Sequence, residues 1–289
     1  MTTSIGRELI RLCLKAATVV VTVVVLIVVI SWLIETKAQI SDGQCNVAVL
    51  PLEGTILPFN GLLEVPLAIT PRSVEEYLTA AEKENDIVAV LIEINSPGGT
   101  PVAAERIADR IYNSSLPTVG LIGDVAASGG YMVAAATDHL IASTMSDVGS
   151  IGVDMSYLEE SKKNEEEGLT YVQLTAGAFK DAGSPNRPLT EEERAKFQKD
   201  LDDVHEEFMR LIAKYRGIDI EAVRPLADGS TRIGKNALEV NLIDTLGGRA
   251  EATGERPPGF VPERPWIRVG LHPFLAAFGH RFLRRALPW

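Results

Sequence analysis

The stretch Pro117-Thr-Val-Gly-Leu-Ile-Gly-Asp-Val-Ala-Ala-Ser-Gly-Gly-Tyr131 decides how the middle of this chain folds. Residues 117–123 are mostly apolar, as in a short buried strand, and residues 130–137 have the small side chains of a tightly packed helix. Ser128 is therefore expected at a strand-to-helix turn. The flanking alanines and glycines allow a sharp bend, and the free N–H groups of the helix start favour a developing negative charge. This pattern suits a nucleophilic serine, and the alternative is an N-cap in an ordinary turn.

A second strand-to-helix junction precedes this one. Residues 87–94 form a nearly continuous apolar run, followed by Asn95-Ser-Pro-Gly-Gly99 and by an expected helix over 102–113. The two glycines offer backbone donors to an anion, and sites in open α/β sheets form at such strand ends. Strand and helix continue to alternate through Thr144, so the sequence predicts an α/β fold with a parallel sheet and flanking helices.

Four motifs resemble, in order and spacing, the signal peptide peptidase A (SppA) family of membrane-anchored serine proteases. They are Asn95-Ser-Pro-Gly-Gly99, Ala127-Ser-Gly-Gly-Tyr131, Val148-Gly-Ser-Ile-Gly-Val153 and Phe179-Lys-Asp-Ala-Gly-Ser-Pro185. The resemblance covers residues 45–250 and implies a Clp protease/crotonase-like fold with a Ser-Lys dyad.

The resemblance also implies roles for individual residues. Ser128 would be the nucleophile and Lys180, 52 residues later, the general base. Ser150 would orient the lysine. The amides of Gly129 and of Gly98 or Gly99 would form the oxyanion hole.

A lysine base must lose its proton at neutral pH, although a free lysine has a pKa of about 10.4. Lys180 follows Ala176-Gly-Ala-Phe179, an apolar surrounding that suits desolvation. The alternative base is a histidine, of which the chain has four: His139, His205, His272 and His280. His139 begins a strand expected to point away from the turn, His205 belongs to a charged helix, and the other two lie near the C-terminus.

Residues 16–34 contain no charged side chain and are dominated by Val, Leu and Ile. This run is long enough to cross most of a hydrocarbon core, so we expect one transmembrane helix. Arg7, Arg11 and Lys15 precede it, which predicts a cytoplasmic N-terminus (1–15) and an extracytoplasmic catalytic domain at the cell membrane. A cleaved secretory signal is the alternative, although Glu35-Thr-Lys-Ala38 is a poor cleavage site.

Three further segments complete the expected organisation. Residues 35–44 form a linker and residues 45–250 the peptidase domain. Residues 251–289 begin with a proline-rich linker and end in a basic amphipathic tail. This tail is expected either to contact the membrane surface or to dock onto the catalytic domain.

Several local helix signals are clear within the peptidase domain. A helix over 74–83 is expected with Ser73 as its N-cap, and an amphipathic helix over 155–168. Thr190 and Glu193 form a capping box for a long helix that extends to about Tyr215.

Composition and charge exclude several classes of function. The net charge of −11 argues against nucleic-acid binding. Cys13 and Cys45 would lie on opposite sides of the membrane, so the sequence predicts neither a disulfide framework nor a Cys-rich metal site. No phosphate-binding or dinucleotide fingerprint is present, so we expect no cofactor, no metal and no ATP dependence.

The expected function is that of a membrane-anchored endopeptidase acting on membrane-associated peptides, remnant signal peptides above all. Short members of the family resemble rings, which implies a homo-oligomer whose dyad is completed across a subunit boundary. One alternative is a protease dedicated to a membrane partner protein, such as a stomatin-like one. Another is a non-catalytic scaffold of the same fold. Crotonase-type acyl-CoA chemistry is disfavoured by the extracytoplasmic placement.

Overall fold

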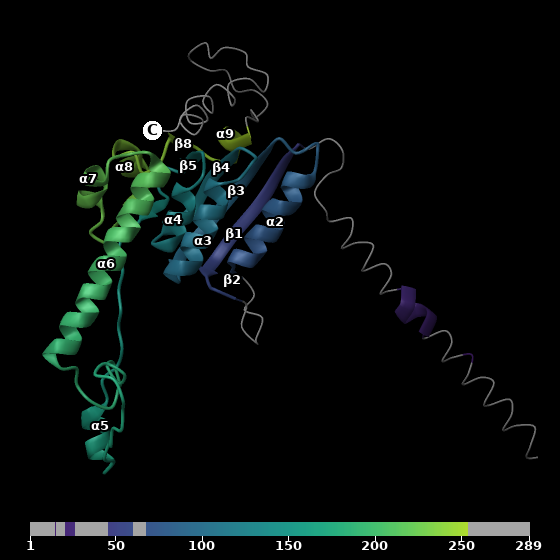
Figure 1. Ribbon diagram of the computed structural model, residues 1–289. Coiled ribbons are helices and arrows are strands. Elements are labelled where there is room, and N and C mark those ends of the chain that lie inside the picture. The colour runs from purple at the N-terminus through teal and green to yellow at the C-terminus, as the bar shows by residue number, and fades with distance from the viewer. Residues whose placement is uncertain (1–14, 16–20, 27–45, 60–67, 254–289) are drawn as a thin grey trace, which may run out of the picture. The chain divides into compact units, whose positions relative to one another are not determined.

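A parallel β-sheet is the centre of the fold (Figure 1). The computed structural model describes residues 15, 21–26, 46–59 and 68–253. The chain divides into two units, residues 1–46 and residues 47–289, and the sheet belongs to the second. Apolar side chains on both faces of the sheet are buried and form the core, such as Val90 and Ile92 on one face and Leu91 on the other.

Eight strands make up the described sheet, and six of them follow the order β2-β1-β3-β4-β5-β8. The strands are β1 (Val47–Ile56), β2 (Ala68–Ile69), β3 (Ala89–Gly99), β4 (Thr118–Ala127), β5 (His139–Ala142), β6 (Asp147–Gly149), β7 (Thr231–Ile233) and β8 (Thr245–Leu246). β6 pairs in parallel with the end of β4, and β7 pairs with β6 in antiparallel orientation. All other pairings are parallel, as the sequence predicted.

Helices connect the strands and cover the sheet. They are α2 (Pro71–Lys83), α3 (Pro101–Tyr112), α4 (Gly129–Ala135), α5 (Ser161–Glu166), α6 (Glu191–Arg216), α7 (Ile220–Val223), α8 (Gly234–Glu239) and α9 (Arg249–Thr253). The predicted helices at 102–113 and 130–137 correspond to α3 and α4. This parallel sheet with flanking helices fits the Clp protease/crotonase-like fold that the resemblance implied.

The capping box at the start of α6 is confirmed. The Glu193 N–H donates to Thr190 Oγ1 (3.2 Å), and the Thr190 N–H donates to Glu193 Oε2 (2.9 Å). These two reciprocal bonds satisfy donors that the helix itself leaves unpaired.

Two local predictions were wrong. The N-cap of α2 is Thr70 rather than Ser73, because Pro71 suits the first helical position and Ser73 takes the third position of the same capping box. The helix expected over 155–168 is limited to α5, Ser161–Glu166. None of the residues of α5 is buried, so no packed apolar face is present to extend it.

The expected transmembrane helix, residues 16–34, lies largely outside the described residues, of which 21–26 are helical. Within the described ranges, no helix has both the length and the apolar character needed to cross a bilayer. The linker 35–44 and the tail from residue 254 onward also fall outside these ranges.

Polar contacts fix the C-terminal end of α6 to the sheet unit. Asp109 of α3 accepts hydrogen bonds from Lys214 Nζ (2.9 Å) and from the Tyr215 hydroxyl (3.0 Å). Arg216, whose side chain is 2% exposed, pairs with Asp244 at 2.8 Å. The N-terminal end of α6 extends away from the sheet, and α5 lies beyond it (Figure 1).

We call residues 155–190 the arm. This segment contains α5 and leads from the sheet to the start of α6. Its hydrogen bonds join it to itself, as between the Glu160 N–H and the Pro185 carbonyl (2.7 Å), and to the first turn of α6. Many of its apolar side chains are exposed, including Leu158 (80%) and Leu174 (94%).

Candidate active site

Ser128 lies between the end of β4 and the start of α4, as predicted, and has an unusual backbone. Its φ of 51° and ψ of −126° fall in a region that residues other than glycine avoid. Such a conformation costs on the order of 1–3 kcal/mol and persists where the surrounding structure enforces it. Here the Ser128 N–H donates to the Gly149 carbonyl (2.8 Å), and the Ser128 carbonyl accepts from the N–H groups of Tyr131 and Met132 (both 3.0 Å).

The glycines at the end of β3 lie directly against this turn. A Cβ added to Gly98 would come within 2.8 Å of the Ala127 carbonyl oxygen and 2.9 Å of the Gly129 nitrogen. Only glycine permits this approach, and the φ of Gly98, 104°, also favours it. The backbone of β3 therefore contacts the start of α4 without an intervening side chain.

The N–H groups of Gly98 and Gly99 differ in their surroundings. The Gly98 N–H donates to Ser96 Oγ (3.1 Å). The Thr100 N–H donates to the Ile56 carbonyl of β1 (3.0 Å), and successive N–H groups of a strand point to opposite sides. The Gly99 N–H therefore points away from β1, and Gly99 N lies 3.5 Å from where a Gly129 Cβ would be.

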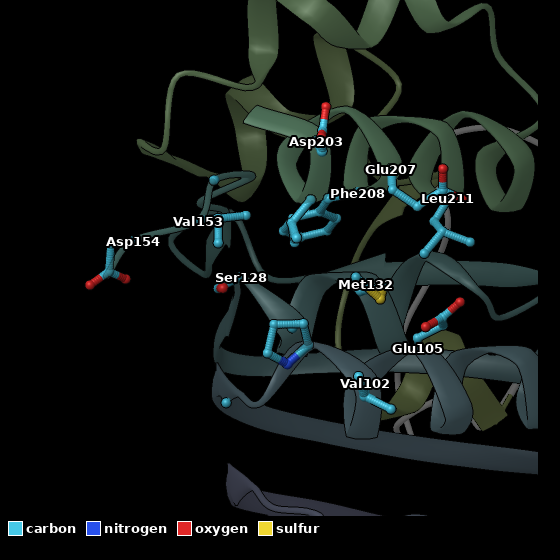
Figure 2. A pocket seen from close by; sticks show the side chains of 15 residues that line it. Val102, Glu105, Ser128, Met132, Val153, Asp154, Asp203, Glu207, Phe208 and Leu211 are labelled. Atoms are coloured by element: carbon cyan, nitrogen blue, oxygen red, sulfur yellow. The ribbon is translucent and has the colours of Figure 1, made fainter. Parts of the chain in front are cut away.

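An apolar pocket of about 410 Å³ opens beside Ser128. Figure 2 shows Phe208 and Leu211 of α6 on one side of it, and Met132 and Val102 on the other. Phe208 and Met132 are buried, whereas Val102 is 66% exposed at the rim. Four carboxylates also line the pocket: Glu105, Asp154, Asp203 and Glu207.

A polar pocket of about 600 Å³ also reaches Ser128. It contains Ser150, Asp154, His205 and Asp228, and it shares Ser128, Gly99 and residues 152–154 with the apolar pocket. The two cavities therefore meet at the Ser128 side chain. In the described part of the chain, no lysine or arginine lines either cavity.

Ser150 has a backbone conformation like that of Ser128, with a φ of 52°. Its N–H donates to the Ser230 carbonyl (2.8 Å), at the end of the β6–β7 pairing. The Ser230 hydroxyl and N–H both donate to the Asp228 carboxylate, and these bonds lower the pKa of Asp228 below its ordinary value. The polar pocket therefore holds an ionised carboxylate near Ser150 at neutral pH.

Lys180 does not line either cavity. It lies in a turn of the arm between Gly177 and Gly183, where its side chain is exposed. The Lys180 N–H donates to the Gly177 carbonyl (3.1 Å) and the Ala182 N–H to the Phe179 carbonyl (3.2 Å). Within one chain, the structure thus gathers Ser128, Ser150 and the glycines, and leaves Lys180 elsewhere.

His205 is a candidate that sequence reasoning set aside. It lies in α6 and lines the polar pocket together with Ser128. Its Nε2 is buried and has no hydrogen-bond partner among the described residues. The sequence contained one signal that could have identified His205. It is three positions from Phe208 on one helix, so the two side chains share a face.

The sequence of this chain is similar to those of known proteases. The model of peptidase family S49 matches residues 110–256. A Synechocystis protein named as a protease is 32% identical over 194 residues, which are 66% of this chain and 70% of that protein.

Two relatives are more similar but longer. A protein named as signal peptide peptidase SppA in Enterococcus faecium is 35% identical over 179 residues, 60% of this chain and 52% of its own. One named as a protease in Methanocaldococcus jannaschii is 35% identical over 173 residues, 59% of this chain and 56% of its own. This chain therefore spans about half the length of these two relatives.

Proposed function

This chain belongs to peptidase family S49, the family of SppA-type serine proteases, and from that membership we propose that it is an endopeptidase whose nucleophile is Ser128 and whose base is Lys180. The observation that carries the proposal is the strained turn at Ser128, at which an apolar and a polar cavity meet. A peptide lying across both cavities brings its carbonyl carbon to the Ser128 hydroxyl.

The proposed reaction proceeds through an acyl-enzyme. Ser128 Oγ bonds to the peptide carbonyl carbon while its proton passes to the neutral amine of Lys180. The C–N bond then breaks, and the amine product leaves with that proton. Water next attacks the ester, gives a proton to Lys180 and forms the acid, and the proton returns to the Ser128 oxygen as it leaves.

Backbone donors stabilise the oxyanion in this proposal. Gly129 is the first residue of α4, so its N–H has no partner within the helix. Gly99 is favoured over Gly98 as the second donor, because the Gly98 N–H already donates to Ser96 Oγ. Two such donors near a developing oxyanion account for a large share of catalysis in acyl-transfer enzymes.

We propose that Lys180 comes from a second copy of this chain, within a homo-oligomer. Among the described residues, the polar pocket has carboxylates and the Ser150 hydroxyl but no lysine or arginine, so its charge suits an incoming ammonium-bearing side chain. Burial between two copies would take the amine out of water, which favours the neutral form that a base requires. The exposed apolar side chains of the arm supply a surface for such contact.

The proposed substrates are peptides with apolar side chains, remnant signal peptides among them. The pocket beside Ser128 is lined mainly by apolar side chains, and its four carboxylates disfavour an acidic residue there. We further propose that residues 16–34 anchor the protein in the cell membrane, with the catalytic domain on the extracytoplasmic side. Such an anchor would hold the site close to peptides left in the bilayer.

The test is labelling of the full-length protein with a fluorophosphonate, followed by intact-protein mass spectrometry. We expect one adduct at Ser128, none in Ser128→Ala, and a labelling rate at least about 100-fold lower in Lys180→Ala. Co-assembled Ser128→Ala and Lys180→Ala chains should regain labelling. Failure of rescue in proven mixed oligomers would contradict the shared site, and no labelling of folded wild type would favour the scaffold.

A histidine base is the second candidate, and it has a specific observation in its favour. The buried, unpartnered Nε2 of His205 lies in the polar pocket with Ser128. His205→Asn separates the candidates: loss of labelling in this variant, with Lys180→Ala still reactive, would assign the base to His205. The reverse result would assign it to Lys180.

A protease dedicated to one membrane partner, such as a stomatin-like protein, remains the alternative for the substrate. Peptides derived from signal sequences and from a candidate partner, compared by kcat/KM on the same preparation, would distinguish the two.

A further inference from the structure

Arg187, an arginine of the arm whose side chain is 23% exposed, donates hydrogen bonds from all three of its guanidinium nitrogens. Its Nε donates to Asp181 Oδ2 (3.0 Å). One terminal nitrogen donates to Glu193 Oε2 (2.9 Å) and the Pro188 carbonyl (3.2 Å). The other donates to Glu193 Oε1 (2.6 Å) and the Asp181 carbonyl (3.2 Å). These five bonds equal the five N–H groups of a guanidinium.

The two carboxylates joined by Arg187 belong to different parts of the chain. Asp181 follows Lys180 in the exposed turn, and Glu193 lies in the first turn of α6. The side chain of Glu193 is only 6% exposed and that of Asp181 15%. The Tyr171 hydroxyl donates to the other oxygen of Asp181 (2.7 Å), so a third segment also holds this carboxylate.

The turn itself has few other attachments. The residues from Tyr171 to Lys180 are all exposed, and the described backbone bonds of the turn are local ones. The position of a side chain on such a turn depends on how firmly the backbone of the turn is held. The bond from Arg187 to the Asp181 carbonyl holds the backbone one residue after Lys180, and the bidentate pair with Glu193 holds Arg187 against α6.

We propose that Arg187 is a positioning residue for Lys180, because its guanidinium fastens the turn of the lysine to the first turn of α6. This inference rests on the proposed role of Lys180 as the base. A lysine at position 187 would keep the charge but not the planar fork, so it would not restore the arrangement. Displacing a catalytic group by about 1 Å can cost about 100-fold in rate.

The arrangement stays charged throughout the physiological pH range. Hydrogen bonds from Arg187 are the main cause that lowers the pKa of Glu193 from 4.5 to about 2. The two negative charges of Asp181 and Glu193 outnumber the single positive charge of Arg187, so removing the arginine would leave them unbalanced. Replacing Arg187 leaves two carboxylates close together, which would drive the turn away from α6.

The test is a double-mutant cycle on the full-length protein, read by the rate of fluorophosphonate labelling at Ser128. We expect Arg187→Gln and Arg187→Lys to lower this rate by about 10- to 100-fold with the oligomeric mass unchanged. Arg194→Gln, which changes an exposed arginine in the same part of α6, is the matched control and should stay within about twofold.

The cycle separates positioning from a general structural role. In a Lys180→Ala background, Arg187→Gln should have no further effect on the residual labelling rate, because the lysine it positions is absent. An equal loss in both backgrounds, or wild-type labelling by Arg187→Gln, would overturn the inference. If wild type itself is not labelled at Ser128, the proposed function fails first, and this inference fails with it.

A second measurement does not depend on catalysis. Amide hydrogen exchange of residues 171–190 should become faster in Arg187→Gln, while residues 118–135, around Ser128, keep their protection. Unchanged exchange in the arm would contradict the inference even if labelling were slower. Asp181→Asn is the second variant for both measurements, because it weakens the same contact while leaving Arg187 and Glu193 paired.

Discussion

The backbone N–H of Ser128 donates a hydrogen bond of 2.8 Å to the carbonyl of Gly149, the residue immediately before Ser150. β4 and β6 run in parallel at this point, and Ala127 is opposite Gly149. The two serines therefore follow paired strand ends and share a left-handed φ, 51° and 52°. Their relative position is set by the sheet rather than by a flexible loop.

This relationship makes Ser150 testable without disturbing the backbone. Ser150→Gly removes the hydroxyl but tolerates the positive φ, so thermal stability should be unchanged or slightly higher. If the hydroxyl orients the lysine, labelling of Ser128 should slow by about 10-fold or more. Labelling at the wild-type rate, with an intact melting curve, would remove Ser150 from the mechanism.

Ser128 itself should be a site of stored strain. Ser128→Gly should raise the free energy of unfolding by about 1 kcal/mol relative to wild type, because glycine adopts this φ and ψ without cost. Ser128→Ala retains a Cβ and should not. Thermal melting of the three full-length proteins checks this, and equal melting temperatures for the Gly and Ala variants would speak against strain.

Val102 should control which side chains enter the apolar pocket. It is 66% exposed at the rim, so Val102→Phe narrows the opening without creating a hole in the core. We expect kcat/KM for peptides with a large apolar residue before the cut to fall by about 10-fold or more, and those with alanine to change less. Val88→Phe, 47% exposed and outside the pocket, is the control. A similar loss in both variants would contradict the assignment.

Acid should weaken the contact between the arm and α6 at one identifiable carboxylate. The folded-state pKa of Glu193, about 2, lies below its ordinary 4.5, so its stabilising contribution is full above about pH 5. That contribution is lost as the pH falls from about 4.5 toward 2. Glu193→Gln should therefore melt at a lower temperature at pH 7, and its deficit should shrink toward pH 2.5.

Thermal melting across this pH range checks the prediction. Glu191→Gln changes an exposed acid in the same turn and is the comparison. A deficit in Glu193→Gln that stays constant with pH would show that the charge of this carboxylate is not the cause.

The sheet and the Ser128 turn were predictable because their signals are local. Apolar runs end in glycine-rich turns, and the alternation of strand and helix fixes a parallel sheet. The capping box at Thr190 and Glu193 was equally predictable, since two residues three positions apart define it. At α2, the proline after Thr70 was the better signal, and Ser73 was misread because a capping serine and a serine at the third helical position look alike.

The surroundings of Lys180 and His205 were not predictable, because they depend on the path of the chain between Gly149 and Glu191. The spacing between Ser128 and Lys180 suits the family but does not say whether one chain or two would bring them together. His205 was taken as part of a charged helix. Its place in the polar pocket depends on how α6 packs against α4, which one sequence does not reveal.

The length of α6 has a consequence for how separate sites would respond to one another. Phe208 and Leu211 line the apolar pocket, while Glu193 holds the arm about 22 to 27 Å away along the same helix. If Lys180 serves a neighbouring copy, the C-terminal half of α6 would contact the substrate of its own copy. The N-terminal end of the same helix would hold the arm that carries the base for the next copy. Peptide binding in one copy would then affect the position of the base in the next copy, and turnover would depend cooperatively on peptide concentration.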